Sequence, residues 1–162
     1  MRDGTFTEAA TPYGLDSLRD GRGLAVSDFD GDGGLDFIVN NYNAPARYFV
    51  NRVPNRGHWL RIRLRGHQSN RDGIGAIIRA RAGDLKMMRV VTAGDGYASQ
   101  YSRIAHFGLG KTSAIEELEV TWPSGKHQVF RHVSADRLIE IDESTDEVLV
   151  VRAAKSNART SN

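Results

Sequence analysis

Four aspartates within one short segment, residues 28–36, have the spacing of a calcium-binding loop. They fall at loop positions 1, 3, 5 and 9, so that alternate carboxylates can point at one centre. Gly33, at position 6, allows the sharp turn, and the main-chain carbonyl of Gly34 at position 7 is expected to add a ligand. So many hard oxygen ligands suit Ca²⁺ better than Mg²⁺, which keeps more of its water. The sequence therefore predicts a calcium site made by Asp28, Asp30, Asp32, Gly34 and Asp36.

The loop departs from an EF-hand in how it closes and in what flanks it. Position 12 is Val39 rather than a bidentate Glu, so Asp36 has to close the site. The flanking runs, residues 24–26 and 37–39, are rich in β-branched and apolar residues, which favours strand–loop–strand over helix–loop–helix. Four carboxylates without a cation would repel one another. The alternative is a polar hairpin whose acids bind no metal.

The calcium loop lies in a first unit, residues 1–53, for which we expect a few short antiparallel strands. These are placed at 5–9, 23–29, 36–41 and 47–51. The segment Gly23–Gly33 resembles an FG-GAP/VCBS repeat, the calcium-loop blade of integrin-type β-propellers. The resemblance implies one propeller blade. Because a propeller needs about four to eight blades, we expect the chain to be the C-terminal end of a longer protein, with the rest of the propeller as a partner.

A second unit, residues 58–141, follows a short boundary at Val53–Gly57, where Pro and Gly interrupt the pattern. Within Trp59–Arg65 three apolar residues alternate with three arginines, which predicts a strand with one buried face. Further strands are expected at 76–82, 85–92, 104–109, 117–122, 128–132 and 138–141. The predicted fold class is all-β, a partial β-propeller blade followed by an antiparallel β-sandwich-like domain. In the tail, residues 142–162, we expect one extra strand at Val148–Val151 and then disorder.

Four local motifs in the second unit resemble the ASPIC/UnbV domain, a C-terminal module of the cartilage acidic protein family. They are Ser69–Ala76, Gly94–Gln100, His106–Gly110 and Val120–Gly125. The resemblance implies an extracellular or cell-envelope protein with calcium in its propeller part and with no established catalytic activity.

The two Gly-rich loops of the second unit carry the candidate binding residues, because they hold polar side chains of several kinds. Arg, Asp and Gln offer directional hydrogen bonds and Tyr offers a stacking face, which suits a polar ligand such as a glycan. The residues are Arg71, Asp72, Asp95, Tyr97 and Gln100. The alternative is that Asn70, Arg71 and Asp72 form a hydrogen-bonded turn that fixes the sheet geometry.

Catalytic residues are not expected in this chain. No Gly-x-Ser-x-Gly elbow occurs, and His106 is expected to be a partly buried ring with a hydrogen bond. The favoured function is therefore a non-enzymatic, calcium-binding binding or adhesion module with a protein or glycan partner. The alternative is a hydrolase acting on polysaccharide, with Asp72 and Asp95 as its two carboxylates, or a carbohydrate-binding module.

Charge is unevenly distributed along a chain whose net charge is only +2. Residues 56–89 hold nine Lys and Arg against two acids, whereas residues 111–147 hold four against nine. Such a basic strip can bind anions, but it is also what the solvated face of a sheet looks like. Nucleic-acid binding through Arg61, Arg63, Arg65 and Arg71 is the least favoured reading, because aromatic residues are not interleaved with the arginines.

Composition excludes further classes. The chain has no Cys, which rules out disulfides, thiolate metal sites and a Cys nucleophile. No apolar run approaches the ~20 residues of a membrane span, and residues 1–6 lack the hydrophobic segment of an export signal.

Overall fold

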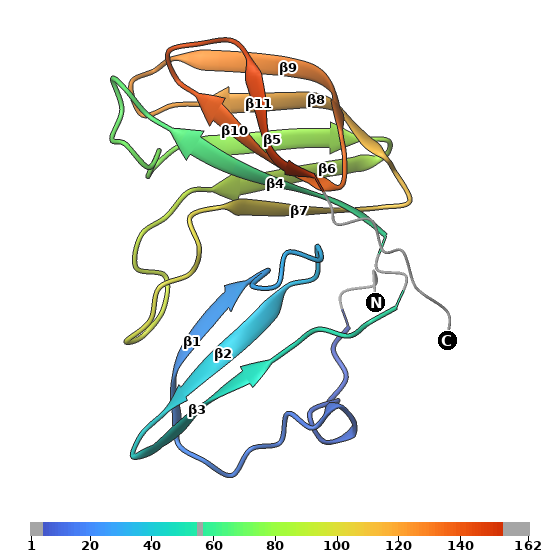
Figure 1. The fold of residues 1–162 in the computed structure, drawn as a ribbon, viewed down its shortest axis with the longest axis vertical. Helices are drawn as coiled ribbons and strands as arrows, with labels where there is room; N and C mark the ends of the chain where they lie inside the picture. The colour runs from blue at the N-terminus through green and yellow to red at the C-terminus, as the bar shows by residue number, and fades with distance from the viewer. Residues whose placement is uncertain (1–4, 55–56, 154–162) are drawn as a thin grey trace.

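The computed structural model describes residues 5–54 and 57–153, in which loops connect eleven strands and one 3-10 turn at Thr11–Tyr13. A three-stranded antiparallel sheet contains β1 (Gly21–Ser27), β2 (Asp36–Asn41) and β3 (Ala44–Phe49) in that order. Figure 1 shows this sheet below a larger sandwich, with the β1–β2 loop pointing toward the sandwich. Among the helices of the described ranges, none has the length and apolar character needed to cross a membrane.

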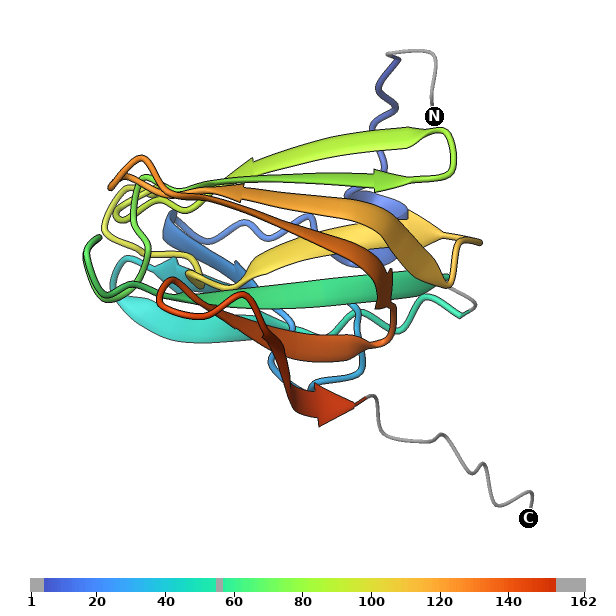
Figure 2. The ribbon, with the colours of Figure 1, turned by 90° about the horizontal axis from the view of Figure 1, so that it is seen from above.

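Two four-stranded sheets form the sandwich, one with the order β11-β10-β4-β7 and the other with the order β6-β5-β8-β9. Seen from above, the β5–β6 hairpin lies on one side of the sandwich and β10 and β11 on the other (Figure 2). The strands are β4 (His58–Arg65), β5 (Ile77–Ala82), β6 (Leu85–Val90), β7 (Ala105–Gly110), β8 (Ala114–Thr121), β9 (His127–Ser134), β10 (Arg137–Asp142) and β11 (Val148–Ala153). The expected all-β, sandwich-like architecture is thus confirmed, including the extra strand in the tail.

One pair of strands departs from the expected antiparallel arrangement, because β10 runs parallel to β4. β9 belongs to the opposite sheet, so the chain crosses between layers before it enters β10. Asp136 fixes this entry: its backbone N–H donates to the Trp59 carbonyl at 2.6 Å, and its carboxylate lies 2.6 Å from Nδ1 of His58. The crossing therefore delivers β10 beside the start of β4.

The strand expected over residues 5–9 is wrong, since these residues form no strand within the described ranges and residues 5–8 are exposed. A local hydrogen bond replaces strand pairing there: the Ala10 backbone N–H donates to the Glu8 carboxylate at 2.7 Å. Side chains that bond nearby backbone groups favour turns over strands, and the 3-10 turn follows at once. The disorder expected at the end of the tail lies outside the described residues.

The apolar core lies between the two sheets of the sandwich. Leu60, Ile62 and Leu64 of β4 are buried, as their alternation predicts, and they join a cluster drawn from both sheets. Every buried hydrophobic residue of the described chain lies between Trp59 and Ile141. The three-stranded sheet therefore contributes nothing to the apolar core and must be held in another way.

Strand pairing brings the basic and acidic parts of the sequence together on the outer faces of the sandwich. In the register, Arg79 on β5 faces Glu119 on β8, and Arg63 on β4 faces Glu140 on β10. Pairs directly opposite on one face interact favourably when their charges differ. Most of the basic residues in the strip at 56–89 therefore lie on solvated sheet faces, beside acidic partners.

Truncation of a core ring provides a test of this packing. Phe107 of β7 is fully buried, so Phe107→Ala should lower the free energy of unfolding by about 3 to 5 kcal/mol. Val129→Ala, on the exposed side of β9, is the matched control and should cost less than about 1 kcal/mol. Urea unfolding measures both, and equal losses would contradict the assigned core.

Candidate functional site

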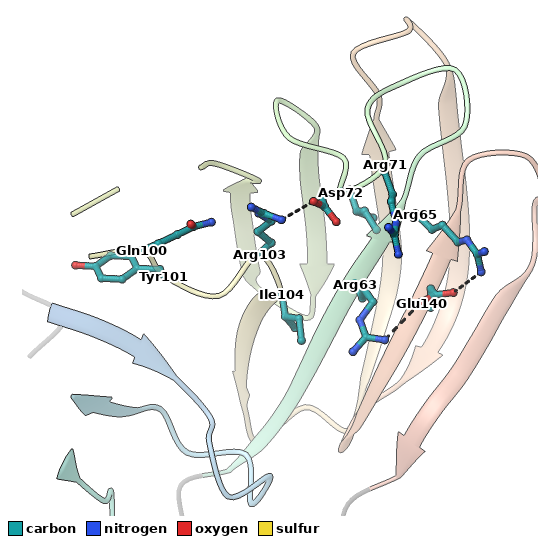
Figure 3. A pocket seen from close by; sticks show the side chains of 10 residues that line it. Arg63, Arg65, Arg71, Asp72, Gln100, Tyr101, Arg103, Ile104 and Glu140 are labelled. Carbon is teal, nitrogen blue, oxygen red and sulfur yellow. Dashed lines mark hydrogen bonds and ion pairs between the residues drawn. The ribbon is translucent and has the colours of Figure 1, made fainter. Parts of the chain in front are cut away.

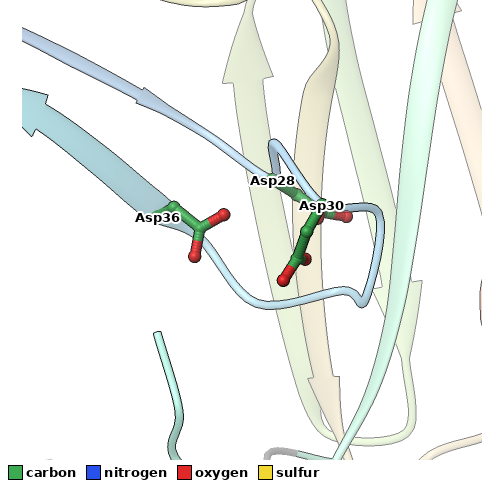
Figure 4. A group of neighbouring side chains, drawn as sticks. All are labelled: Asp28, Asp30 and Asp36. Atoms are coloured by element: carbon green, nitrogen blue, oxygen red, sulfur yellow. The ribbon is translucent and has the colours of Figure 1, made fainter. Parts of the chain in front are cut away.

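The β1–β2 loop gathers three of the predicted metal ligands. Oxygen atoms of Asp28, Asp30 and Asp36 all lie within 4.8 Å of one another, and the first and last of these residues are buried (Figure 4). Three converging carboxylates are the donor set that a hard cation takes. The chemistry and spacing of the cluster therefore fit a divalent metal ion.

Backbone hydrogen bonds wrap the loop around the two buried carboxylates. Asp28 accepts from the N–H groups of Gly31 at 2.7 Å, Asp32 at 3.1 Å and Gly33 at 3.1 Å. Asp36 accepts from the backbone N–H groups of Phe29 and Asn51 and from the Tyr48 hydroxyl. These bonds fix both carboxylates in place from opposite ends of the loop.

The third carboxylate, Asp30, is the one whose charged form is disfavoured within the cluster. Although Asp30 is exposed, partial desolvation within the loop raises its pKa above the ordinary value, and the charges of Asp32 and Asp36 add to this effect. Asp32 turns back onto the loop, where its carboxylate accepts the Gly34 backbone N–H at 2.9 Å. A bound cation would offset the repulsion and favour the charged form of Asp30.

The same loop docks onto the outer face of the sandwich. Arg61 of β4 donates to the Asp28 carboxylate at 2.9 Å, and the Asp28 side chain is 0% exposed. The His106 ring of β7 donates from Nε2 to the Gly33 carbonyl at 3.0 Å. Burial lowers the pKa of His106, so a neutral ring serves as the donor, and the expectation of a partly buried, hydrogen-bonded histidine is confirmed.

Gly33 sits directly against the Trp59 indole. A Cβ at Gly33 would lie 1.9 Å from Nε1 of Trp59, and the residue has a φ of +90°, which L side chains rarely adopt. The indole in turn stacks on the His106 ring, with centroids 6.4 Å apart. The loop glycine thus serves two needs, the turn of the loop and its close approach to β4.

A second candidate site lies on the same face, further along β4. A cavity of about 690 Å³ brings together three of the predicted ligand-binding residues, Arg71, Asp72 and Gln100 (Figure 3). β4 adds Arg63 and Arg65, whose alternation with the core residues places them on this face. The charged lining consists of Arg63, Arg65, Arg71, Asp72, Arg103 and Glu140.

Two predicted residues do not line this cavity. Asp95 accepts a hydrogen bond from the nearby Thr92 hydroxyl, and Tyr97 is 75% exposed. The Asp95 carboxylate is therefore hydrogen bonded to a residue at the start of its own loop. As a result, Asp72 and Asp95 do not flank a shared cavity, which is what a two-carboxylate hydrolase would need.

Glu143 is the residue that sequence reasoning missed. Its buried carboxylate accepts hydrogen bonds from the backbone N–H groups of His67, Gln68 and Ser69 and from the hydroxyls of Ser69 and Ser124. Within the loop that it anchors, Asn70 exchanges two hydrogen bonds with the Ile74 backbone. The expected turn is therefore real, and it positions Arg71 and Asp72 at the cavity.

Comparison with known proteins adds three findings. The profile of the ASPIC and UnbV family matches residues 66–148. Cartilage acidic protein 1 of Xenopus tropicalis is 38% identical over 132 residues, and that of Homo sapiens is 35% identical over 128 residues. The matches cover 75% and 76% of this chain but only 19% of each relative, so the chain spans about a fifth of their length.

Substitution of Gly33 tests the docked position of the loop. Gly33→Ala should lower the melting temperature for two reasons. Alanine is strained in the left-handed backbone conformation, and its Cβ would clash with Trp59. Gly125→Ala is the control, because Gly125 has nearly the same φ, +89°, with no atom near its missing Cβ. Thermal melting should show a clearly larger drop for Gly33→Ala; a drop no larger than that of the control would contradict the close approach.

The pH dependence of stability tests the role of Glu143. Burial alone would raise the pKa of Glu143, but hydrogen bonds from Ser124, His67 and Ser69 lower it from 4.5 to about 2. Since the folded-state pKa is the lower one, the stabilisation is present above pH ~4.5 and is lost as the pH falls toward 2. Glu143→Gln should therefore be less stable than the parent by about 3 kcal/mol at pH 7.

The difference between Glu143→Gln and the parent should shrink between pH 5 and pH 2, as measured by urea unfolding. Glu147→Gln, an exposed neighbour on the same segment, is the control and should match the parent at each pH. A difference that stays constant across this range would show that the Glu143 charge is not the cause.

Proposed function

We propose a calcium-stabilised binding function for this chain, which belongs to the ASPIC and UnbV family. In this proposal the chain acts by binding or adhesion to a protein or glycan, without catalysis, outside the cell or in the cell envelope. The observation that carries the proposal is the cluster of Asp28, Asp30 and Asp36, seated on the sandwich. Calcium has a structural role, because the cluster lies in a buried turn rather than at the cavity.

The properties of the cluster favour calcium over a metal-free turn. Two of its carboxylates are buried, and the pKa of the third, the exposed Asp30, is raised by partial desolvation in the loop and by the neighbouring charges of Asp32 and Asp36. Calcium accepts six to eight oxygen ligands in flexible geometry, which suits carboxylates that also accept backbone hydrogen bonds. Asp32 and the Gly34 carbonyl are the remaining proposed ligands.

The cavity supports binding rather than hydrolysis. Its two carboxylates each lie within ion-pair distance of arginine, Asp72 of Arg103 and Glu140 of Arg63 and Arg65, and each keeps lone pairs that can accept from a ligand. The hydrolase alternative relied on Asp72 and Asp95, and Asp95 does not line the cavity that contains Asp72. The relatives carry the name cartilage acidic protein 1, after a tissue that consists largely of extracellular matrix, which supports a location outside the cell.

The three-stranded sheet is proposed to be one blade of a propeller in a longer protein, with residues 1–53 as the blade and residues 58–141 as the second domain. Apolar side chains on and around this sheet are exposed, among them Phe29, Tyr42 and Tyr48. A sheet of three strands needs a covered apolar face to be stable by itself. Neighbouring blades would supply that cover, and the greater length of the relatives leaves room for them.

Removal of one carboxylate should have opposite effects with and without calcium. Without calcium, Asp30→Asn relieves repulsion and should leave the melting temperature unchanged or slightly higher. With calcium, the parent should gain about 2.7 kcal/mol at a concentration 100 times its Kd, whereas the variant should gain far less. Calorimetric titration and melting curves in calcium and in chelator measure these effects.

Asp84→Asn, in the exposed β5–β6 turn, removes a carboxylate far from the loop and serves as the control. It should respond to calcium as the parent does. The proposal fails if calcium leaves the melting temperature of the parent unchanged, or if Asp30→Asn gains as much as the parent.

A further inference from the structure

We infer that the cavity lined by Arg63, Arg65, Arg71 and Arg103 binds an acidic saccharide, one that carries carboxylate or sulfate groups beside free hydroxyls. The inference deepens the proposed binding function and rests on it, but it does not depend on the calcium site. At about 690 Å³ the cavity falls within the range of small-molecule binding sites.

The charge of the cavity selects an anion. Four guanidinium groups face two carboxylates, and Figure 3 shows their side chains gathered around the cavity. Glu140 lies 3.6 Å from Arg63 and 3.8 Å from Arg65, beyond normal hydrogen-bond distance. Both guanidinium groups therefore keep donors for a ligand. Arginine is suited to this because its planar fork can bind an oxyanion with two parallel hydrogen bonds.

Arg71 is the most available of the four. Within residues 5–54 and 57–153 no ion pair is recorded for its guanidinium, whereas Arg103 is paired with Asp72. The loop that carries Arg71 is held by the buried Glu143, so the position of its backbone is fixed before a ligand arrives. With the backbone fixed, binding has to order only the exposed side chain of Arg71.

The acceptors in the cavity favour a saccharide over a nucleic acid. Asp72 and Glu140 can accept hydrogen bonds from the free hydroxyls that a saccharide presents between its anionic groups, whereas a DNA backbone presents phosphates without free hydroxyls. Gln100 adds an amide and Tyr101 adds a half-buried ring, against which the apolar face of a sugar can pack. The combination of excess positive charge with embedded acceptors matches a ligand that has both anionic groups and hydroxyl donors.

A second cavity extends the site toward the three-stranded sheet. It has a volume of about 400 Å³, shares Gln100 and Tyr101 with the first cavity, and is lined on its other side by Ala25, Val26 and Phe29. The shared residues lie between two hollows that follow one another across the surface. This geometry suits an extended chain of sugars rather than a single ring.

Binding to three soluble polymers provides the test. Hyaluronate supplies carboxylates, dextran sulfate supplies sulfates, and dextran is neutral. In low salt and calcium, the parent protein should bind at least one acidic polymer and not dextran. Arg71→Gln and Arg63→Gln should each weaken that binding at least tenfold, and Arg71→Lys should weaken it too, because lysine keeps the charge but loses the fork. Preference for one acidic polymer identifies the anionic group.

Arg79→Gln is the matched control, because it removes the same charge from the opposite sheet. It should bind as the parent does, and melting curves should show that all variants fold. The inference is overturned if neither acidic polymer binds, if Arg79→Gln weakens binding as much as Arg71→Gln, or if single-stranded DNA binds as tightly as the acidic polymers. Failure here with calcium binding intact would leave the proposed calcium function standing.

Discussion

The contact between Arg61 and the buried Asp28 carboxylate is the interaction on which the rest of the arrangement depends. It joins the β1–β2 loop to β4 at a place from which water is largely excluded, since the two side chains are 11% and 0% exposed. A buried charge is costly unless it is paired and hydrogen bonded. Asp28 meets that need from two sources, the backbone of its own loop and an arginine of the other sheet.

One face of one sheet performs two tasks because residues alternate along β4. Every second residue from Trp59 to Arg65 points away from the core, and the first two of these, Trp59 and Arg61, hold the β1–β2 loop. The next two, Arg63 and Arg65, line the arginine cavity. The two sites therefore use consecutive outward-facing residues of the same strand. The three-stranded sheet, which adds no residue to the apolar core, is placed by these polar contacts beside the cavity.

Local patterns in the sequence predict the parts of this structure that depend on residue spacing. The alternation of residues 59–65 identified β4 and its two faces, and the aspartate spacing identified the three carboxylates that converge. What lies beyond local spacing was not predictable. Glu143 is one of nine acids in an acidic stretch, and only the fold brings it to a loop more than 70 residues earlier in the chain. The parallel pairing of β10 with β4 likewise depends on a crossing between layers. Asp95 was predicted at the binding site, but its carboxylate accepts a hydrogen bond from the neighbouring Thr92 hydroxyl instead.

Amide hydrogen exchange with and without calcium tests the central claim most directly, that a cation at the loop stabilises its docking on the sandwich. Calcium should slow exchange at Gly31, Asp32 and Gly33, whose N–H groups bond to Asp28. The protection should spread to the indole N–H of Trp59, which lies against Gly33. Protection confined to other parts of the chain, or no change at the loop, would contradict the claim.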